Sequence, residues 1–176
     1  TDSTLSILQE YKVTINKGPC QRFSANFISL IKKADPKSDY FAFCDQDDVW
    51  KPNKLKNALA TLALVPKEMP ALYCGRTQLV NEKLENIGYS PLFKKRPSFK
   101  NALVQSIAGG NTMVFNQAAL KLLQASKSDY PIVSHDWWAY LLISGAGGKI
   151  YYDPTPNILY RQHTGNIVGC NIGLKP

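Results

Sequence analysis

The chain has 176 residues, of which 44% are hydrophobic and 19% are charged, and these values are typical of one globular domain with a sizeable core. The net charge of +8 favours anionic partners such as nucleotide diphosphates or an acidic membrane surface. The four cysteines, at positions 20, 44, 74 and 170, form no C-x-x-C pair. Their spacing argues against a structural zinc site and favours reduced thiols in the cytoplasm.

The densest cluster of positive charge comprises Lys94, Lys95, Arg96 and Lys100. It has none of the residue patterns of a nucleic-acid-binding module, so we expect no nucleic-acid partner. Contact with the surface of a membrane is an alternative use of the same charges. No stretch of the sequence approaches the ~20 apolar residues of a membrane span, and no signal-peptide pattern is present.

In the first third of the chain the pattern predicts two helices and two strands. A helix begins at Asp2 or Ser3 and is followed by a short strand over residues 12–16. A second helix runs over residues 23–33 and ends before Asp35-Pro36. The apolar run 40–44 is bounded by turn residues and suits a buried strand.

The middle of the chain continues this alternation. Pro52 suits the first turn of a helix that continues through Leu62. Residues 71–80 form a predicted strand, and residues 81–88 a turn that leads into a weaker strand. Residues 99–107 form a predicted helix.

In the last third, a loop at Gly109-Gly110 precedes a strand over 112–115 and a helix over 117–124. Ser134 can cap a helix over 135–144, which three nearby glycines close. Strands over 149–152 and 158–161 follow. Alternating strands and helices predict an α/β domain.

Three carboxylates, Asp45, Asp47 and Asp48, follow the strand predicted over residues 40–44. In open α/β sheets, ligands bind beyond the carboxyl ends of the strands. Carboxylates this close repel one another, and a hard divalent cation such as Mg²⁺ or Mn²⁺ would relieve the repulsion while holding phosphate oxygens. The alternative is a solvated acidic turn before the Pro52 helix.

Two other acidic motifs were compared with this cluster. An EF-hand loop that begins at Asp45 needs Gly and Glu where this chain has Trp50 and Lys56, so that motif is excluded. The D-x-D-x-V pattern of Asp45, Asp47 and Val49 also fits a haloacid-dehalogenase-type phosphatase. That class needs a later acidic pair, which the sequence lacks, and it stays as a rival enzyme class.

Four motifs occur in the order found in bacterial family-2 glycosyltransferases, particularly the rhamnosyltransferase-like branch. They are Phe43-Cys44-Asp45-Gln46-Asp47-Asp48-Val49-Trp50 followed by Pro52-Asn53-Lys54-Leu55, then Gly109-Gly110-Asn111-Thr112-Met113, His135-Asp136-Trp137-Trp138 and Tyr160-Arg161-Gln162-His163. The chain resembles that family over residues 41–163. The resemblance implies a three-layer α/β nucleotide-diphospho-sugar transferase domain of the GT-A type, with a mixed, mainly parallel sheet.

The first residues, Thr1-Asp2-Ser3-Thr4, resemble the end of that family's Asp-Asp-Gly-Ser-Thr-Asp stretch. We therefore expect residues 1–176 to be a single partial catalytic domain without the family's N-terminal strand region. A sheet edge left open in this way invites pairing with another chain, so a homo-oligomer is expected. An inactive transferase fold that serves as a binding or assembly module is the non-enzymatic alternative.

The resemblance also implies roles for the acidic residues. Asp45 would contact the donor and the metal, Asp47 would be the main metal ligand, and Asp48 would support the loop. Asp136 would be the general base that deprotonates the acceptor hydroxyl. Its place at a helix start also suits a purely structural role, because a carboxylate there stabilises the helix.

Further roles follow from the same resemblance. His163 would reach the metal or diphosphate, and Arg161 would pair with phosphate oxygens. Gly109 and Gly110 would let the backbone approach the donor. Trp137 and Trp138 point to different helix faces, so at most one would line an acceptor platform.

The resemblance implies a nucleotide-diphospho-sugar donor and a glycan or lipid-linked glycan acceptor of the cell surface. The branch of the family that the chain resembles favours dTDP-rhamnose as the donor. The reaction would be metal-dependent and inverting. It would take place in the cytoplasm, with peripheral contact at the inner face of the membrane.

Overall fold

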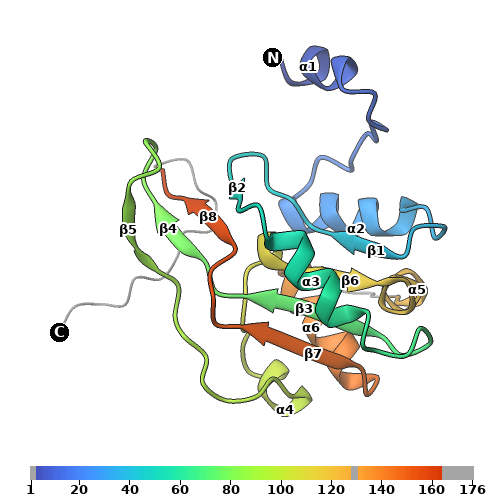
Figure 1. Cartoon of the computed structure of the whole chain (residues 1–176). Helices are drawn as coiled ribbons and strands as arrows, with labels where there is room; N and C mark the ends of the chain where they lie inside the picture. Colours follow the sequence, from blue (N-terminus) through green and yellow to red (C-terminus); the bar gives the residue numbers. More distant parts are fainter. Residues whose placement is uncertain (1–2, 128–130, 164–176) are drawn as a thin grey trace.

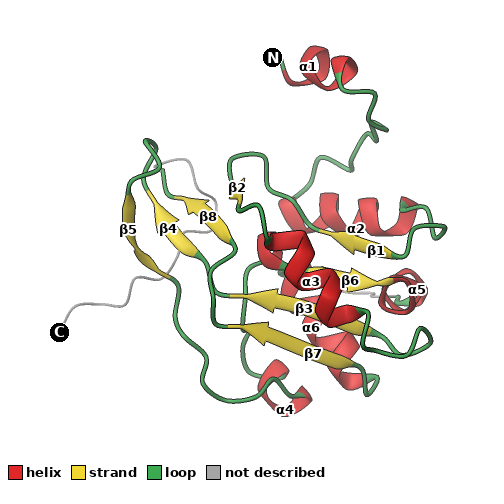
Figure 2. Cartoon of the chain, viewed as in Figure 1, coloured by secondary structure: helices red, strands yellow, loops and turns green. Residues whose placement is uncertain are grey.

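The computed structural model describes residues 3–127 and 131–163, which form an α/β fold with two four-stranded sheets (Figures 1 and 2). The helices are α1 (Thr4–Glu10), α2 (Phe23–Lys33), α3 (Lys54–Leu62), α4 (Phe99–Ala102), α5 (Gln117–Ala125) and α6 (His135–Gly145), with a 3-10 turn η1 (Gly110–Thr112). The strands are β1 (Tyr40–Ala42), β2 (Val49–Trp50), β3 (Ala71–Gly75), β4 (Gln78–Val80), β5 (Asn86–Tyr89), β6 (Val114–Asn116), β7 (Lys149–Asp153) and β8 (Ile158–Arg161).

The first sheet has the strand order β1-β6-β3-β7. Strand β6 is antiparallel to both of its neighbours, β1 and β3, whereas β3 and β7 are parallel. Strands β1, β3 and β7 therefore run in the same direction, and β6 alone is reversed. This sheet is mixed and mainly parallel in strand direction, as expected from the sequence.

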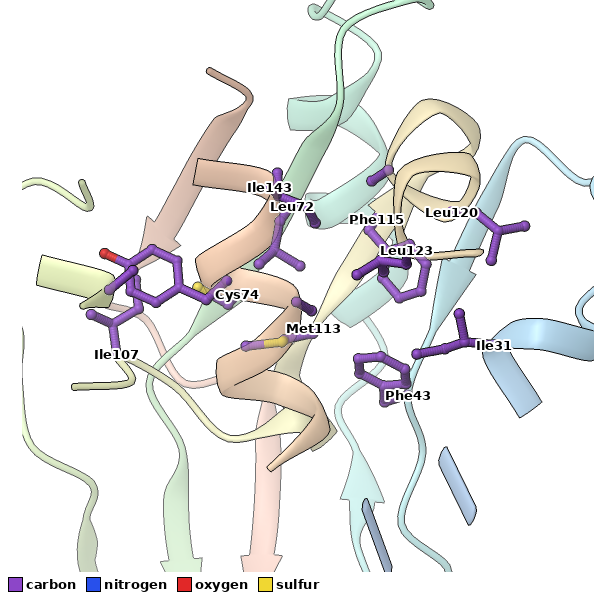
Figure 3. Packing of buried hydrophobic residues seen from close by; sticks show 14 residues of the cluster. Ile31, Phe43, Leu72, Cys74, Ile107, Met113, Phe115, Leu120, Leu123 and Ile143 are labelled. Atoms are coloured by element: carbon purple, nitrogen blue, oxygen red, sulfur yellow. The ribbon is translucent and has the colours of Figure 1, made fainter. Parts of the chain in front are cut away.

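Helices cover both faces of the first sheet, because side chains along β3 alternate between two cores. Leu72 and Cys74 pack into the larger core with α2, α5 and α6 (Figure 3). Ala71 and Tyr73 face the smaller core under α3. The central strand is fully buried for this reason, and the arrangement has the three layers expected from the sequence.

The second sheet has the order β2-β8-β4-β5 and is a continuation of the first. After β3 the chain passes through Arg76 and Thr77 into β4, and after β7 it passes into β8. Strands β4 and β8 are parallel, as β3 and β7 are. The single strand predicted over residues 71–80 is thus wrong, because its two halves belong to different sheets.

Several predicted boundaries also differ from the structure. Residues 12–16 form no strand, since no neighbouring strand hydrogen-bonds to them among the described residues. Strand β1 ends at Ala42 rather than residue 44, and helix α4 ends at Ala102 rather than residue 107. The strand predicted over 112–115 begins only at Val114, after η1. Strand β2 was not predicted; it is two residues long and pairs with β8.

Helix α1 contributes no buried residue, and in Figure 1 it lies away from the two sheets at the end of an extended segment. Of its two predicted capping residues, Ser3 occupies the N-cap position without a side-chain cap hydrogen bond, and Asp2 lies outside the described residues. In the described part of the chain, no helix has the length and apolar character needed to cross a membrane.

Candidate active site

The acidic loop lies between β1 and β2, at the junction of the two sheets. Buried Phe43 packs into the larger core just before it. Asp48 accepts hydrogen bonds from the side-chain amide of Asn111 (2.5 Å) and from the backbone N–H of Arg161 (3.1 Å). Asp48 therefore ties the loop to η1 and to the end of β8, which is the supporting position expected for it.

Asp47 lies beside the chain that leaves β8. Its carboxylate is 2.9 Å from Nε2 of His163. The guanidinium of Arg161 donates from Nε to the backbone carbonyl of Asp47 (2.9 Å) and from Nη1 to that of Glu82 (2.7 Å). The first and last predicted motifs are thus in direct contact, and Arg161 links the acidic loop to the turn after β4; its pairing with phosphate oxygens stays a prediction.

Asp45 has a perturbed titration. Its pKa is raised to about 6, first by partial burial and then by the charges of Asp48, Asp47 and Asp136. The charge of Asp136 matters most for the site, because Asp136 lies in α6 and is far from Asp45 in the sequence. The adjacent residues Gly110 and Asn111 also donate hydrogen bonds to Asp136 and to Asp48, so the four carboxylates are gathered in one acidic cluster.

Asp136 lies in the first turn of α6. Its carboxylate accepts hydrogen bonds from the backbone N–H of Gly110 (2.9 Å), the backbone N–H of Trp137 (2.7 Å) and the hydroxyl of Ser134. Burial raises its pKa, and the backbone hydrogen bonds oppose that rise. A general base needs both features, since burial increases its basicity and fixed donors hold its orientation.

Gly110 is required by this arrangement. A Cβ atom at this position would lie 2.5 Å from Nε2 of His135 and 3.3 Å from Cβ of Asp136. The two glycines therefore differ: Gly110 is buried and carries the contact to Asp136, whereas Gly109 is exposed. The role of both in binding a donor stays a prediction.

His135 packs inside an aromatic cluster. Its ring stacks on Phe27 at a centroid distance of 3.9 Å and meets the ring of Phe43 edge-on at 4.6 Å. Burial lowers its pKa to about 4, so the imidazole is neutral at pH 7. His135 therefore has a packing role in this cluster.

The two tryptophans after Asp136 are both partly buried. The indole N–H of Trp137 donates to the backbone carbonyl of Ala102 (2.6 Å), and its ring packs against the larger core. The indole N–H of Trp138 is buried without a hydrogen-bond partner among the described residues. Trp137 thus has a structural contact, and an acceptor platform at either position stays a prediction.

Asn111 and Lys54 belong to the motifs of the sequence, but sequence reasoning assigned no role to either. Lys54 is 1% exposed, its ammonium lies 3.6 Å from the centroid of the Trp50 ring, and burial lowers its pKa to about 8. A helical spacing of four residues links Lys54 to the buried Ala58 and Leu62, and this spacing could have revealed that Lys54 faces inward.

The oxygen and nitrogen atoms of the acidic loop and His163 suit a divalent cation whose coordination is completed by a bound ligand. Among residues 3–127 and 131–163, no three His, Cys, Asp or Glu side chains form a metal site by themselves. Mg²⁺ in nucleotide sites is commonly held by only one or two carboxylates, with phosphate oxygens and water supplying the rest. Asp47 and His163, which lie 2.9 Å apart, could supply two such ligands, and a role for Asp45 as a further ligand stays a prediction.

Comparisons with known proteins identify the family of the chain. Residues 1–123 match the family described as "Glycosyl transferase family 2". The chain is also 30% identical over 195 aligned residues to "dTDP-rhamnosyl transferase RfbG" of Shigella flexneri, an alignment that covers 99% of this chain and 64% of that protein. The chain thus spans about two thirds of the length of this relative.

This similarity weakens the phosphatase alternative, because both matches point to one family of transferases. It also agrees with the α/β architecture and mixed sheets described above. The ordered motifs, the acidic cluster that they form and the family match lead to one conclusion: the chain belongs to glycosyltransferase family 2.

Proposed function

We propose that this protein is a metal-dependent, inverting glycosyltransferase that moves a sugar from a nucleotide-diphospho-sugar to a hydroxyl group of a cell-surface glycan. One observation carries the proposal: the adjacent residues Gly110 and Asn111 donate hydrogen bonds to Asp136 and to Asp48, so the carboxylate of α6 lies beside the acidic loop. A donor held at the acidic loop would therefore lie next to a buried, oriented carboxylate. The family match supports the same reaction class.

In this mechanism, Asp136 accepts the proton of the acceptor hydroxyl as that oxygen attacks the anomeric carbon. Gly110 and Trp137 hold the carboxylate in place through their N–H groups. Asp47, together with Asp45 or His163, would hold a divalent cation, Mg²⁺ or Mn²⁺, which when bound would neutralise the charge on the departing diphosphate. A single displacement with one base inverts the configuration at the anomeric carbon.

We propose rhamnose as the sugar, since the relative named above is a dTDP-rhamnosyl transferase. The acceptor would be a growing glycan, carried on a lipid at the cytoplasmic face of the membrane. Turnover assays with a panel of nucleotide-sugars test the donor. Nuclear magnetic resonance of the product's anomeric proton tests inversion.

Replacement of Asp136 by Asn tests the base. Asn preserves the size of the side chain but cannot accept the acceptor proton, so kcat should fall by roughly 100-fold or more, while donor binding stays within a few-fold of wild type. Turnover assays measure kcat, and calorimetry measures donor binding. Asp39→Asn, at an exposed position, is the matched control, and normal turnover by Asp136→Asn would exclude Asp136 as the base.

Replacement of Asp47 by Ala tests the metal site. The substitution removes the carboxylate that contacts His163, so Mn²⁺ should no longer strengthen binding of a nucleotide diphosphate. Calorimetric titrations with and without Mn²⁺ measure this effect, with Asp39→Ala as the control. Equal Mn²⁺ dependence in wild type and Asp47→Ala would assign the metal to other ligands.

A binding or assembly module is the second candidate, and helix α1, with no buried residue, is the observation that favours it. An exposed apolar segment of this kind offers a surface to a second copy or another chain. Light scattering on the purified chain measures the oligomeric state. Turnover of a nucleotide-sugar by this same chain would support the enzyme and exclude the inactive module.

A further inference from the structure

The surface formed by residues 92–104 is both basic and apolar, and we call it the 92–104 surface. Lys94, Lys95, Arg96 and Lys100 are all exposed. Four large apolar side chains lie among them: Leu92 is 43% exposed, Phe99 44%, Leu103 59% and Val104 72%. Exposed apolar side chains that gather in one place mark an interaction site more often than scattered ones do.

The inner side of this surface is held firmly by the protein. The hydroxyl of Tyr140 in α6 donates to the carbonyl of Ser98 (2.9 Å) and accepts from its backbone N–H (3.0 Å). Ala102 is buried, and Phe93 packs edge-on against Tyr152. The backbone of the segment is therefore anchored to the protein, while its four cations and four of its large apolar side chains are exposed.

No negative charge in the surrounding sequence offsets the cations. Residues 86–128 contain no Asp or Glu, although they include six Lys or Arg. The acidic cluster of the active site comes from other segments of the chain. The segment itself therefore carries only positive charge, which is complementary to an extended anionic partner.

We propose that the 92–104 surface docks on an anionic lipid bilayer. Phosphate headgroups attract the four cations, and the interfacial zone of the bilayer takes up the apolar side chains. A nucleic acid would satisfy the cations alone, since aliphatic side chains such as Leu103 and Val104 gain little from a phosphate backbone. This inference goes beyond the proposed transfer reaction and stands without it.

Docking through this surface has a consequence for the active site. Helix α4 packs on α6, and the indole of Trp137 donates to the carbonyl of Ala102. The same end of α6 carries Asp136. A bilayer that holds residues 92–104 would thus be coupled through one rigid contact to the helix of the proposed base.

Sedimentation with lipid vesicles tests the proposal. The wild-type chain should bind vesicles of phosphatidylcholine mixed with phosphatidylglycerol, should bind poorly to phosphatidylcholine alone, and should dissociate as salt rises. Combined replacement of Lys94, Lys95, Arg96 and Lys100 by Gln should weaken the partition coefficient by about a hundredfold or more, since each cation near the surface accounts for about fivefold. Replacement of Leu103 and Val104 by Ser should weaken it by about tenfold while preserving its salt dependence.

The matched control replaces Lys37, Lys56, Lys67 and Lys83 by Gln, which removes the same charge from exposed positions elsewhere. Equal loss in the control and in the cation variant would overturn the proposal, because binding would then follow net charge alone. Weak vesicle binding together with tight binding to RNA or to an acidic protein would also overturn it. Sugar transfer to a short soluble acceptor should be unchanged in these variants, so a failed docking test and a failed transfer reaction are distinguishable.

Discussion

The side chain of Lys54 lies inside the protein, where its ammonium group contacts the ring of Trp50 and has no hydrogen-bond acceptor among the described residues. Burial of a charge without a partner is costly, and a cation–π contact recovers only part of the cost. This cost explains why the pKa of Lys54 falls to about 8 in the folded chain.

Lys54→Met should therefore stabilise the protein at pH 7 by about 1–2 kcal/mol, since Met fills a similar volume without a charge. Between pH 8 and 10.5, folded Lys54 is neutral while the unfolded residue still binds a proton, so wild type should gain stability as pH rises. The advantage of the variant should shrink over that range. Urea unfolding of wild type and Lys54→Met at both ends of this pH range measures the difference in stability.

The control for that experiment is Lys56→Met, on the exposed face of the same helix. Its stability should follow wild type at every pH. A Lys54→Met protein less stable than wild type at pH 7 would mean that the cation–π contact outweighs the burial of the charge.

At the scale of single residues, the sequence singled out the acids that the structure brings together but not their hydrogen-bond partners. The D-x-D pattern and the helix start at Ser134 located Asp45, Asp47 and Asp136. The hydrogen bonds of Asp48 to Asn111 and to Arg161 depend on how β8 is placed beside the acidic loop. That placement is a property of the sheet, so no local pattern reveals it.

At the scale of elements, the turn between α6 and β7 depends on two adjacent glycines for different reasons. Gly147 has a φ of +76° with nothing near its missing side chain. Gly148 has no positive φ, but a Cβ there would lie 2.5 Å from the carbonyl oxygen of Pro70 and 2.7 Å from that of Ile143. One glycine is needed for its conformation and the other for space.

Gly148→Ala should accordingly destabilise the protein by about 2–4 kcal/mol, because two backbone carbonyls would have to move. Gly147→Ala is the matched comparison and should cost only about 1 kcal/mol, the penalty of a left-handed conformation. The free energy of unfolding in urea measures both. Equal losses would show that the turn relaxes to accommodate a side chain.

The elements also show where pattern reasoning works. Helices α2, α5 and α6 were predicted within one or two residues, since apolar periodicity reflects the face that they bury. The strand predicted over 12–16 failed because alternation defines a strand only when a sheet edge is available. The prediction over 71–80 failed because a continuous apolar run does not reveal that the chain changes sheets at Arg76-Thr77.

At the scale of the whole molecule, the N-terminal segment adds little to the fold that is described. Removal of residues 1–16 should change the free energy of unfolding by less than about 1 kcal/mol, since no described residue in this segment is buried. Urea unfolding of the shortened chain measures this. A loss above about 2 kcal/mol would mean that the segment has a packing partner in solution.

The overall fold class and the three layers followed from the alternation of elements and the family resemblance. The second sheet was not predicted as a separate unit, because its strands are short and its pairings join segments that are distant in sequence. The acidic cluster depends on that sheet, since Arg161 and His163 reach the loop from β8.

The two parallel pairs have a mechanical consequence. Strands β3 and β7 leave the first sheet side by side and enter the second as β4 and β8, so two covalent connections cross the junction together. A hinge at this junction would have to bend both connections in concert and would shear the bond between Asp48 and Arg161. The two sheets are therefore expected to move as one rigid block, and a substrate would be admitted by rearrangement of surface loops.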